Sequence, residues 1–468
     1  MSDCDKPLLD KVIENRNCIG CGACAFAFPE QFAMRAIHGS WQAQLLPAAA
    51  TEPDTAPETI CPHSGAGLDE TEIGARLYPQ AKKDPRLGRY RSTLVGHVEE
   101  GGFRAGGSSG GMITWLLADL LERGEVDGVV HVRPAMHRDD GLLFEYAIST
   151  TVEQVQEGAK SRYYPIEMSG VLKLVNEGDK RFAFVGIPCF VKAVRQLQFA
   201  GLLRKDAARI CVGLVCGHLK SKYFGEYLAW QAGVAEEEIE TLDFRHKLAD
   251  RPASQYGFAV SQRGKDTPLV RPMQDLNGKD WGEGLFKNPA CEFCDDVFAE
   301  CADISVGDAW LPRHVDDPAG TNVVVIRDEV TATLVQAAIE DGRLSFEEAS
   351  CDTLALSQAA GLRHRRAGLS HRLARRIEKG IWAPRKRVEP ALAKSPRRRL
   401  VYDYRLQIAE TGAAQFEAAK AAGDVRLFEQ AMAGLLQDYR RTVRDNLPLR
   451  LAKKAWRFGR KLLHAALP

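Results

Sequence analysis

The sequence predicts an α/β protein with a cysteine-rich N-terminal segment and a basic, helical C-terminal extension. Three observations lead to this fold class. Apolar runs of strand length alternate with amphipathic stretches of helix length in the middle of the chain. Cysteines separated by two-residue spacers occur near the start of the chain and again near residue 290. Residues 361–468 carry 26 Lys and Arg against 9 Asp and Glu, although the whole chain has a net charge of only +1.

A chain of 468 residues is too long for one hydrophobic core, and we divide it into four predicted parts. These parts are residues 1–85, 86–175, 176–355 and 356–468. The two central parts contain short apolar runs bounded by glycine, proline or charge, which is typical of buried strands in an α/β sheet. The predicted strands are 127–132, 182–186 and 210–215, and the predicted helices include 112–123 and 188–197.

The first part contains the run Cys18-Ile-Gly-Cys21-Gly-Ala-Cys24. Its double C-x-x-C spacing lets three thiolates point at one centre, as in iron–sulfur proteins. We therefore predict a ferredoxin-like segment with a [4Fe-4S] cluster. A structural zinc site is the competing interpretation, because C-x-x-C pairs also bind zinc.

The fourth ligand of this predicted cluster must come from outside the run. In bacterial ferredoxins a cysteine follows three residues later and precedes a proline, but here Phe28 stands at that position. Cys61 is the nearest cysteine that precedes a proline, and it is our predicted fourth ligand. Cys4 is the alternative.

A glycine-rich loop, Ala105-Gly-Gly-Ser-Ser-Gly-Gly111, opens the predicted helix of the second part. Such a loop offers free N–H groups and the positive end of the helix dipole to a phosphate or pyrophosphate. Lys160, Ser161 and Arg162 follow and add cations for the same anion. A solvated connecting turn is the alternative interpretation.

The third part carries a second set of cysteines. Cys189 and Cys216 follow the strands 182–186 and 210–215, and the ends of parallel strands open on one edge of a sheet. These two thiols can therefore be neighbours, and Cys291-Glu-Phe-Cys294 supplies a further pair. Any one of the four could instead be a buried free cysteine.

Three motifs follow one another along the chain: Ser109-Gly-Gly-Met-Ile-Thr114-Trp-Leu-Leu, Gly186-Ile-Pro-Cys189, and the stretch from Cys291 through Asp308. In this order they resemble the beta subunits of the deazaflavin (coenzyme F420) hydrogenases and dehydrogenases, and also 7-hydroxymethyl chlorophyll a reductase. The resemblance covers residues 10–350, and it implies a mixed α/β flavin domain with FAD beside iron–sulfur clusters.

By this resemblance, Cys189, Cys216, Cys291 and Cys294 would bind a second [4Fe-4S] cluster near FAD. The residues that would hold FAD are Gly107, Ser108, Ser109, Gly110, Gly111, Thr114, Lys160, Ser161 and Arg162. The family's Ser-Lys-Tyr motif is Ser-Arg-Tyr here. His218 and Asp308 are weak candidates for catalytic proton or substrate contacts, since each is more often a structural group.

We expect an oxidoreductase that passes electrons from a ferredoxin-like donor through two [4Fe-4S] clusters to FAD and an unidentified organic substrate. The reverse direction of electron flow is equally compatible with the residues. One alternative is the electron-input subunit of a larger hydrogenase or dehydrogenase complex, using a deazaflavin. Another is a non-catalytic iron–sulfur binding protein.

The basic extension predicts an anionic contact. Residues Leu449 to Leu467 have the pattern of a basic amphipathic helix, which would pack on the acidic body or dock on an anionic membrane surface. We see no signal-peptide pattern and no apolar run of membrane-spanning length. The expected location is cytoplasmic, with a peripheral contact at the inner membrane face as the alternative. We expect no nucleic-acid partner, and the oligomeric state is left open.

Overall fold

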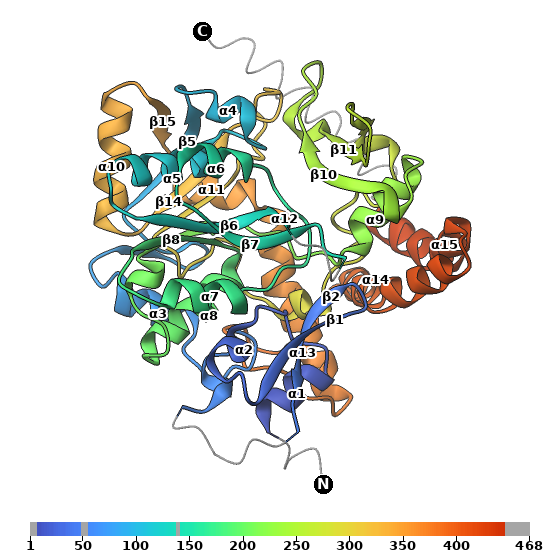
Figure 1. Cartoon of the computed structure of the whole chain (residues 1–468). Coiled ribbons are helices and arrows are strands. Elements are labelled where there is room, and N and C mark those ends of the chain that lie inside the picture. Colours follow the sequence, from blue (N-terminus) through green and yellow to red (C-terminus); the bar gives the residue numbers. More distant parts are fainter. Residues whose placement is uncertain (1–6, 48–54, 137–140, 445–468) are drawn as a thin grey trace.

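The computed structural model describes residues 7–47, 55–136 and 141–444. It is a mixed α/β fold with one large sheet, smaller sheets at its sides and a helical C-terminal part (Figure 1). The fold class predicted from the sequence is confirmed at this level. The division into four parts remains a prediction.

The large sheet has eight strands, and its centre is parallel. In order across the sheet the strands are β15 (Leu344–Glu348), β5 (Ser92–Val98), β14 (Asn322–Ile326), β13 (Ile304–Asp308), β9 (Ile210–Leu214), β8 (Phe182–Gly186), β6 (Gly128–Pro134) and β7 (Phe144–Ser149). Strands β13, β9, β8 and β6 run parallel to one another, and the remaining pairs are antiparallel. The three strands predicted from the sequence are thus β6, β8 and β9.

Helices cover both faces of this sheet, as the strand sequences require. Along β8, Phe182 and Phe184 join one apolar core whereas Ala183 and Val185 join another, because successive side chains point to opposite faces. One face is covered by α5 (Met112–Glu122), α6 (Val152–Glu157) and α10 (Glu329–Glu340); the other by α7 (Ser169–Asn176) and α8 (Pro188–Phe199) (Figure 1).

The N-terminal segment packs below the second of these faces. It contains α1 (Leu8–Glu14), α2 (Ala23–Ala27), the hairpin of β1 (Phe32–Ile37) and β2 (Ser40–Leu45), α3 (Glu70–Leu77), and the short pair β3 (Lys82–Asp84) and β4 (Gly88–Tyr90). Helix α2 contacts both α7 and α8. The first cysteine run is thereby brought against the helices that follow β7 and β8.

A three-stranded antiparallel sheet stands beside the large one. It consists of β10 (Ile239–His246), β11 (Gly257–Gln262) and β12 (Leu269–Pro272), and it follows α9 (Tyr223–Gln231). A short helix, α4 (Phe103–Gly106), precedes the glycine-rich loop. Single turns of 3-10 helix join the elements at η1 (Pro57–Thr59), η2 (Asp206–Ala208), η3 (Glu236–Glu238), η4 (Ala253–Gln255), η5 (Met273–Asp275) and η6 (Pro289–Phe293).

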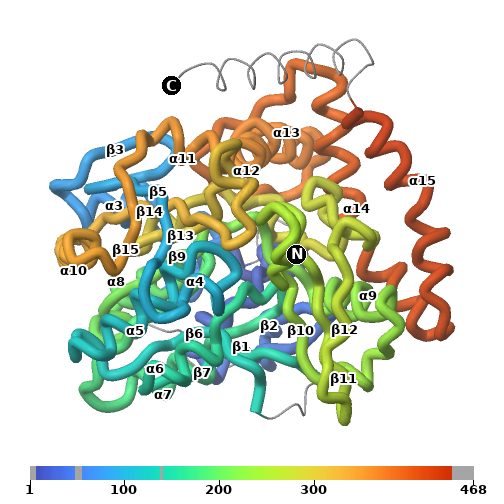
Figure 2. The backbone as a smooth tube through the Cα atoms, turned by 90° about the horizontal axis from the view of Figure 1, so that it is seen from above, coloured from blue at the N-terminus to red at the C-terminus, as the bar shows by residue number. Residues whose placement is uncertain are grey.

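The described part of the extension is helical and lies along one border of the molecule (Figure 2). Its elements are α11 (Cys351–Ser357), α12 (Ala359–Arg363), the π-helical turn η7 (His364–Gly368), α13 (Leu369–Glu378), α14 (Pro396–Ala421) and α15 (Val425–Val443). Phe416 of α14 and Phe428 of α15 pack edge to face on Tyr227 of α9. This aromatic cluster attaches the helical pair to the body.

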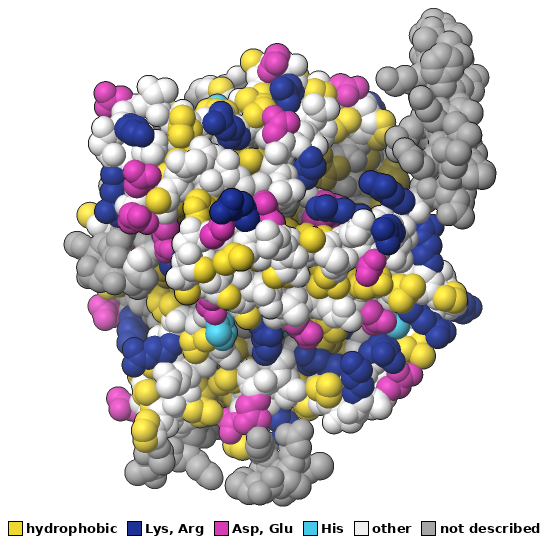
Figure 3. All heavy atoms as spheres, turned by 90° about the vertical axis from the view of Figure 1, so that its right-hand side faces the viewer, with side chains coloured by type: hydrophobic (Ala, Val, Ile, Leu, Met, Phe, Trp, Pro, Cys, Tyr) yellow, Lys and Arg dark blue, Asp and Glu magenta, His cyan; other side chains and the backbone are white. Residues whose placement is uncertain are grey.

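Charge also joins the extension to the acidic body. Lys420 pairs with Glu226 and Glu236, and Arg440 donates to Glu283 at 2.6 Å. Lys420 and Arg440 therefore bind the extension to the body. Other Lys and Arg side chains are spread over the outer face in Figure 3. Residues 449–467, the predicted amphipathic helix, lie outside the described residues. No helix within the described ranges is both long and apolar enough to cross a membrane.

Candidate functional site

The parallel centre of the sheet brings two of the predicted cysteines to one edge. Strands β8 and β9 are hydrogen-bonded neighbours in parallel register, with Gly186 opposite Gly213. Cys189 lies in the first turn of α8, directly after β8, and Cys216 follows β9. Asp308 ends the next parallel strand, β13. The expectation that these strand ends share an edge is confirmed.

We call Cys189, Cys216, Cys291 and Cys294 the second cysteine group. The three other thiols all lie close enough to Cys189 to raise its pKa, after burial, which is the largest cause. Burial also raises the pKa of Cys216 to about 12 and that of Cys291 to about 11. The Leu219 N–H donates to the Cys291 sulfur at 3.2 Å and opposes this effect. The four predicted residues thus lie near enough to one another for their charges to interact.

We call Cys18, Cys21, Cys24 and Cys61 the first cysteine group. Burial is again the main cause of the raised pKa of Cys21 and Cys24, and Cys61 adds to it at both thiols. The Ala43 N–H of β2 donates to the Cys18 sulfur at 3.4 Å. Cys61 therefore lies beside the C-x-x-C-x-x-C run, while Cys4 lies outside the described residues.

Two glycines give the first group its backbone path. Gly20 and Gly22 have φ angles of +74° and +84°, a left-handed conformation that residues with a Cβ rarely adopt. A Cβ on Gly20 would stand 2.3 Å from the Trp41 carbonyl oxygen, and one on Gly22 would stand 2.3 Å from a Glu167 carboxylate oxygen. The loop can pass these neighbours only where no side chain is present.

The two cysteine groups adjoin each other. The Cys21 thiol contributes to the raised pKa of Cys189 across the boundary between them. Tyr146 lies close to both Cys189 and Cys21, and its hydroxyl donates to the Val185 carbonyl at 3.0 Å. The N-terminal segment and the sheet edge are thus far apart in the sequence but adjacent in the fold.

In the part of the chain that the structure describes, no three His, Cys, Asp or Glu side chains are close enough together to hold a single metal ion. The zinc and the iron–sulfur interpretations of the cysteine groups therefore both remain predictions.

The glycine-rich loop meets the segment predicted to share its ligand. The Ser161 N–H donates to Ser108 Oγ at 2.9 Å. Some of the loop's polar groups already have partners: the Met112 N–H donates to Asn322 Oδ1 at 3.2 Å, and Ser109 Oγ donates to the Thr321 carbonyl at 3.0 Å. The start of α5 is therefore less free to bind an anion than the sequence suggested.

The predicted cations differ in their availability. Lys160 is 3.3 Å from the Asp243 carboxylate, with an unusual φ of +97° for a residue with a Cβ. Arg162 donates to the carbonyls of Leu242 and Ala159 and stacks over the Phe144 ring. The Arg162 guanidinium is thus engaged within the protein, where the sequence suggested an anion contact.

Lys247 is a cation at this loop that the sequence did not single out. Its ammonium donates to the Ser109 carbonyl at 2.9 Å and to the Arg104 carbonyl. Burial, and then the positive charges of Lys160 and Arg104, lower the pKa of Lys247 to about 8. Lys247 follows β10 directly and reaches the loop only because the three-stranded sheet docks there, which the sequence does not show.

The two weak catalytic candidates occupy different surroundings. Asp308 accepts from Arg245 at 3.0 and 3.3 Å, and the Arg245 side chain lies over the rings of Tyr256 and Trp310. His218 packs against Trp281, and burial holds its pKa well below the usual range. Asp308 therefore orients a buried arginine, and His218 is a neutral imidazole near pH 7.

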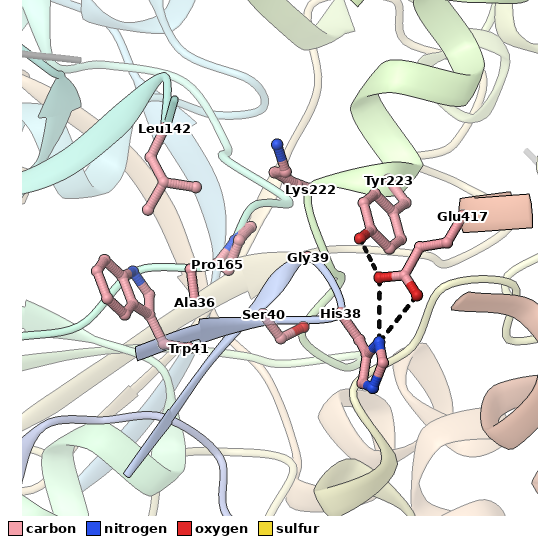
Figure 4. A pocket seen from close by; sticks show the side chains of 10 residues that line it. All are labelled: Ala36, His38, Gly39, Ser40, Trp41, Leu142, Pro165, Lys222, Tyr223 and Glu417. Carbon is pink, nitrogen blue, oxygen red and sulfur yellow. Dashed lines mark hydrogen bonds and ion pairs between the residues drawn. The ribbon is translucent and has the colours of Figure 1, made fainter. Parts of the chain in front are cut away.

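The structure also has a cavity of about 310 Å³ at a different place. It lies where the turn between β1 and β2 meets α9 and α14, and Glu417 there accepts from the Tyr223 hydroxyl and from His38 (Figure 4). Trp41 and Lys222 also line it. None of the site residues predicted from the sequence lines this cavity.

Comparison with known families identifies the α/β body. The family model for the N-terminal part of the coenzyme F420 hydrogenase/dehydrogenase beta subunit matches residues 93–173, and the model for the C-terminal part of the same protein matches residues 179–351. Together they cover more than half of the chain. The chain belongs to this family, as the sequence motifs indicated, and residues 352–468 lie beyond the match.

Individual relatives are distant. The chain is 23% identical over 328 residues to the coenzyme F420-dependent sulfite reductase of Methanocaldococcus jannaschii, covering 69% of this chain but only 46% of that protein. It is 23% identical over 265 residues to the coenzyme F420 hydrogenase subunit beta of Methanothermobacter thermautotrophicus, covering 55% of this chain and 84% of that one. The chain thus spans about half the length of the sulfite reductase and most of the length of the hydrogenase subunit.

Among solved structures, the chain resembles one from the F420-reducing [NiFe] hydrogenase complex of Methanosarcina barkeri. The TM-score is 0.49 and the sequence identity is 20%, with 65% of this chain and 98% of that chain covered.

Proposed function

We propose that this chain is an electron-transfer subunit of a larger oxidoreductase complex that exchanges electrons with a deazaflavin. The observation that carries the proposal is the pair of adjoining cysteine groups within and just before the family match. Relatives named as hydrogenase and dehydrogenase subunits support this assignment over the stand-alone, ferredoxin-linked flavoenzyme that we expected first.

Each cysteine group would hold one [4Fe-4S] cluster. The donor set fits, since each group offers four thiols and at least one backbone N–H directed at sulfur. When bound, such clusters carry single electrons, and a deazaflavin takes up two electrons and a proton as a hydride. The cysteine sulfurs lie in buried surroundings that raise their pKa, so each thiol would give up its proton on binding a cluster.

The deazaflavin, or a flavin such as FAD, would bind between the glycine-rich loop and the three-stranded sheet. Ser108 and Ser161 lie together there, and Lys247 beside the loop would provide positive charge for an anionic ligand, whereas Lys160 is already paired with Asp243. Arg245 and its aromatic neighbours would line the part of the site nearest Asp308. The name of the family favours a deazaflavin. FAD is the alternative ligand, which the motif resemblance implies.

The deazaflavin assignment can be tested with the full chain purified without oxygen. Reduced methyl viologen is supplied as the electron donor, and the loss of the oxidised coenzyme F420 absorbance is followed. We expect catalytic reduction, and we expect Lys247→Met to raise the KM for coenzyme F420 several-fold because a cation beside the loop is lost. If added FAD is reduced and coenzyme F420 is not, the deazaflavin assignment is wrong.

A further inference from the structure

The C-terminal extension places one buried arginine against the second cysteine group. Arg365 lies in the π-helical turn η7, beyond the end of the family match at residue 351, and only 2% of its surface is exposed. Its Nη1 donates to the Cys216 carbonyl at 2.7 Å. Turns of π-helix inside longer helices are frequent at functional sites.

The charge of Arg365 lies near sulfur atoms. Burial lowers the pKa of Arg365, but the nearby Cys294, Cys216 and Cys291 thiols raise it overall. Within the described ranges, no Asp or Glu forms an ion pair with Arg365. Its positive charge is therefore free to offset the negative charge of thiolates.

Two neighbouring side chains of the extension, the Arg372 guanidinium and the buried His364 imidazole, face a carboxylate instead. Arg372 and His364 approach the Glu292 carboxylate at 3.0 and 3.2 Å, and Lys287 pairs with it as well. Glu292 lies between Cys291 and Cys294 in the sequence and is fully buried. Arg372 also donates to the Glu292 carbonyl at 2.8 Å, which fastens η7 and α13 to the cysteine loop and fixes Arg365 in place.

The first cysteine group has a different charge environment. At the first group the Glu167 carboxylate contributes to the raised pKa of Cys21, and the Lys386 ammonium lowers that of Cys61. At the second group the Asp296 carboxylate raises the pKa of Cys216, but the Arg365 guanidinium lowers it by more. A reduced cluster carries one more negative charge than an oxidised one, so a buried guanidinium beside it stabilises the reduced form. A carboxylate has the opposite effect.

We propose that Arg365 raises the reduction potential of the cluster held by the second cysteine group above that of the cluster at the first. This inference rests on the proposed function, because it requires both groups to bind clusters. Arg365 acts through the cysteines as a positioning and electrostatic residue. The extension would thereby determine where electrons reside within the body.

The test is a redox titration of the full chain, followed by electron paramagnetic resonance, with three variants. Arg365→Gln removes the charge, Arg365→Lys keeps it, and Arg366→Gln removes the adjacent arginine, which instead donates to the Pro85 carbonyl. At a fixed potential we expect the ratio of reduced to oxidised second cluster to fall about tenfold in Arg365→Gln, or about 59 mV for one electron. Arg365→Lys should recover most of this shift, and Arg366→Gln should show none.

Two outcomes separate this inference from the proposed function. If Arg365→Gln keeps its iron and the reduction potential of its second cluster is unchanged, the role of Arg365 is wrong but the proposed clusters are not affected. Absence of iron from the parent chain would overturn both.

If Arg365→Gln does not fold, a measurement on the parent chain tests whether Arg365 contacts the second cluster. Protein labelled with ¹⁵N-arginine should show a weak ¹⁵N coupling to the reduced second cluster in pulsed electron paramagnetic resonance. That coupling should vanish in Arg365→Lys, and its absence from the labelled parent would refute the proposed contact.

Discussion

At the scale of single residues, the cysteines are the candidate cluster ligands, and the glycines determine the path of the backbone around them. In the proposed function the cysteines supply the chemistry, and their spacing and strand-end positions made seven of the eight predictable as two sets. Cys61 was predictable only from the proline after it, and the structure places it beside Cys21 and Cys24. Lys247 and Arg365 gave no local signal, because their positions depend on how a distant sheet and helix dock.

Gly22→Ala should prevent iron binding at the first cysteine group. The new Cβ would stand 2.3 Å from the Glu167 carboxylate and 2.9 Å from the Ser169 nitrogen, in addition to the cost of a left-handed φ. Gly102→Ala is the matched control, since Gly102 has a φ of +69° but nothing within 4 Å of the added carbon. Iron analysis should show about half the parent content in Gly22→Ala and the full content in Gly102→Ala. Equal iron in both variants would show that the close approach at Gly22 is unimportant.

Cys61→Ser should remove the first cluster and leave the second, because its thiol is the fourth in the first group. Cys351→Ser serves as control, since Cys351 lies at the start of α11 and belongs to neither group. The measurement is the loss of one of two signals in electron paramagnetic resonance. If Cys4→Ser has this effect and Cys61→Ser does not, Cys4 is the ligand.

At the scale of elements, the extension is attached more firmly than its charge alone suggested. The sequence indicated a basic helical region and an acidic body, and ion pairs such as Arg387 with Glu300 at 2.8 Å join the two. The aromatic cluster around Phe416 could not be predicted, since its members come from α9, α14, α15 and the loop at Phe286. Such long-range packing leaves no periodic pattern in the sequence.

Phe416→Ala should destabilise the attachment of α14 to the body. Phe416 is fully buried, with ring contacts to Tyr223, Tyr227 and Phe286, and loss of such a ring costs about 3–5 kcal/mol. Thermal unfolding should begin several degrees lower, with faster amide hydrogen exchange in α14 and α15. Leu427→Ala, at a residue that is 44% exposed, should change neither measurement. Unaltered exchange in Phe416→Ala would mean that charge alone holds these helices.

At the scale of the whole molecule, the fold collects residues from three of the four predicted parts around one sheet edge. The N-terminal run, the strand ends of β8 and β9, the Cys291–Cys294 loop and η7 meet there. The sequence could predict the parallel strands and the cysteine sets, because period and spacing are local properties. It could not predict that the two groups adjoin, nor that a residue outside the family match reaches one of them.

Metal and sulfide analysis, combined with spectroscopy, decides whether the two cysteine groups bind two iron–sulfur clusters. We predict about eight iron and eight sulfide per anaerobically purified chain, and two distinct paramagnetic signals on full reduction. Bound zinc with iron and sulfide near zero would contradict the account.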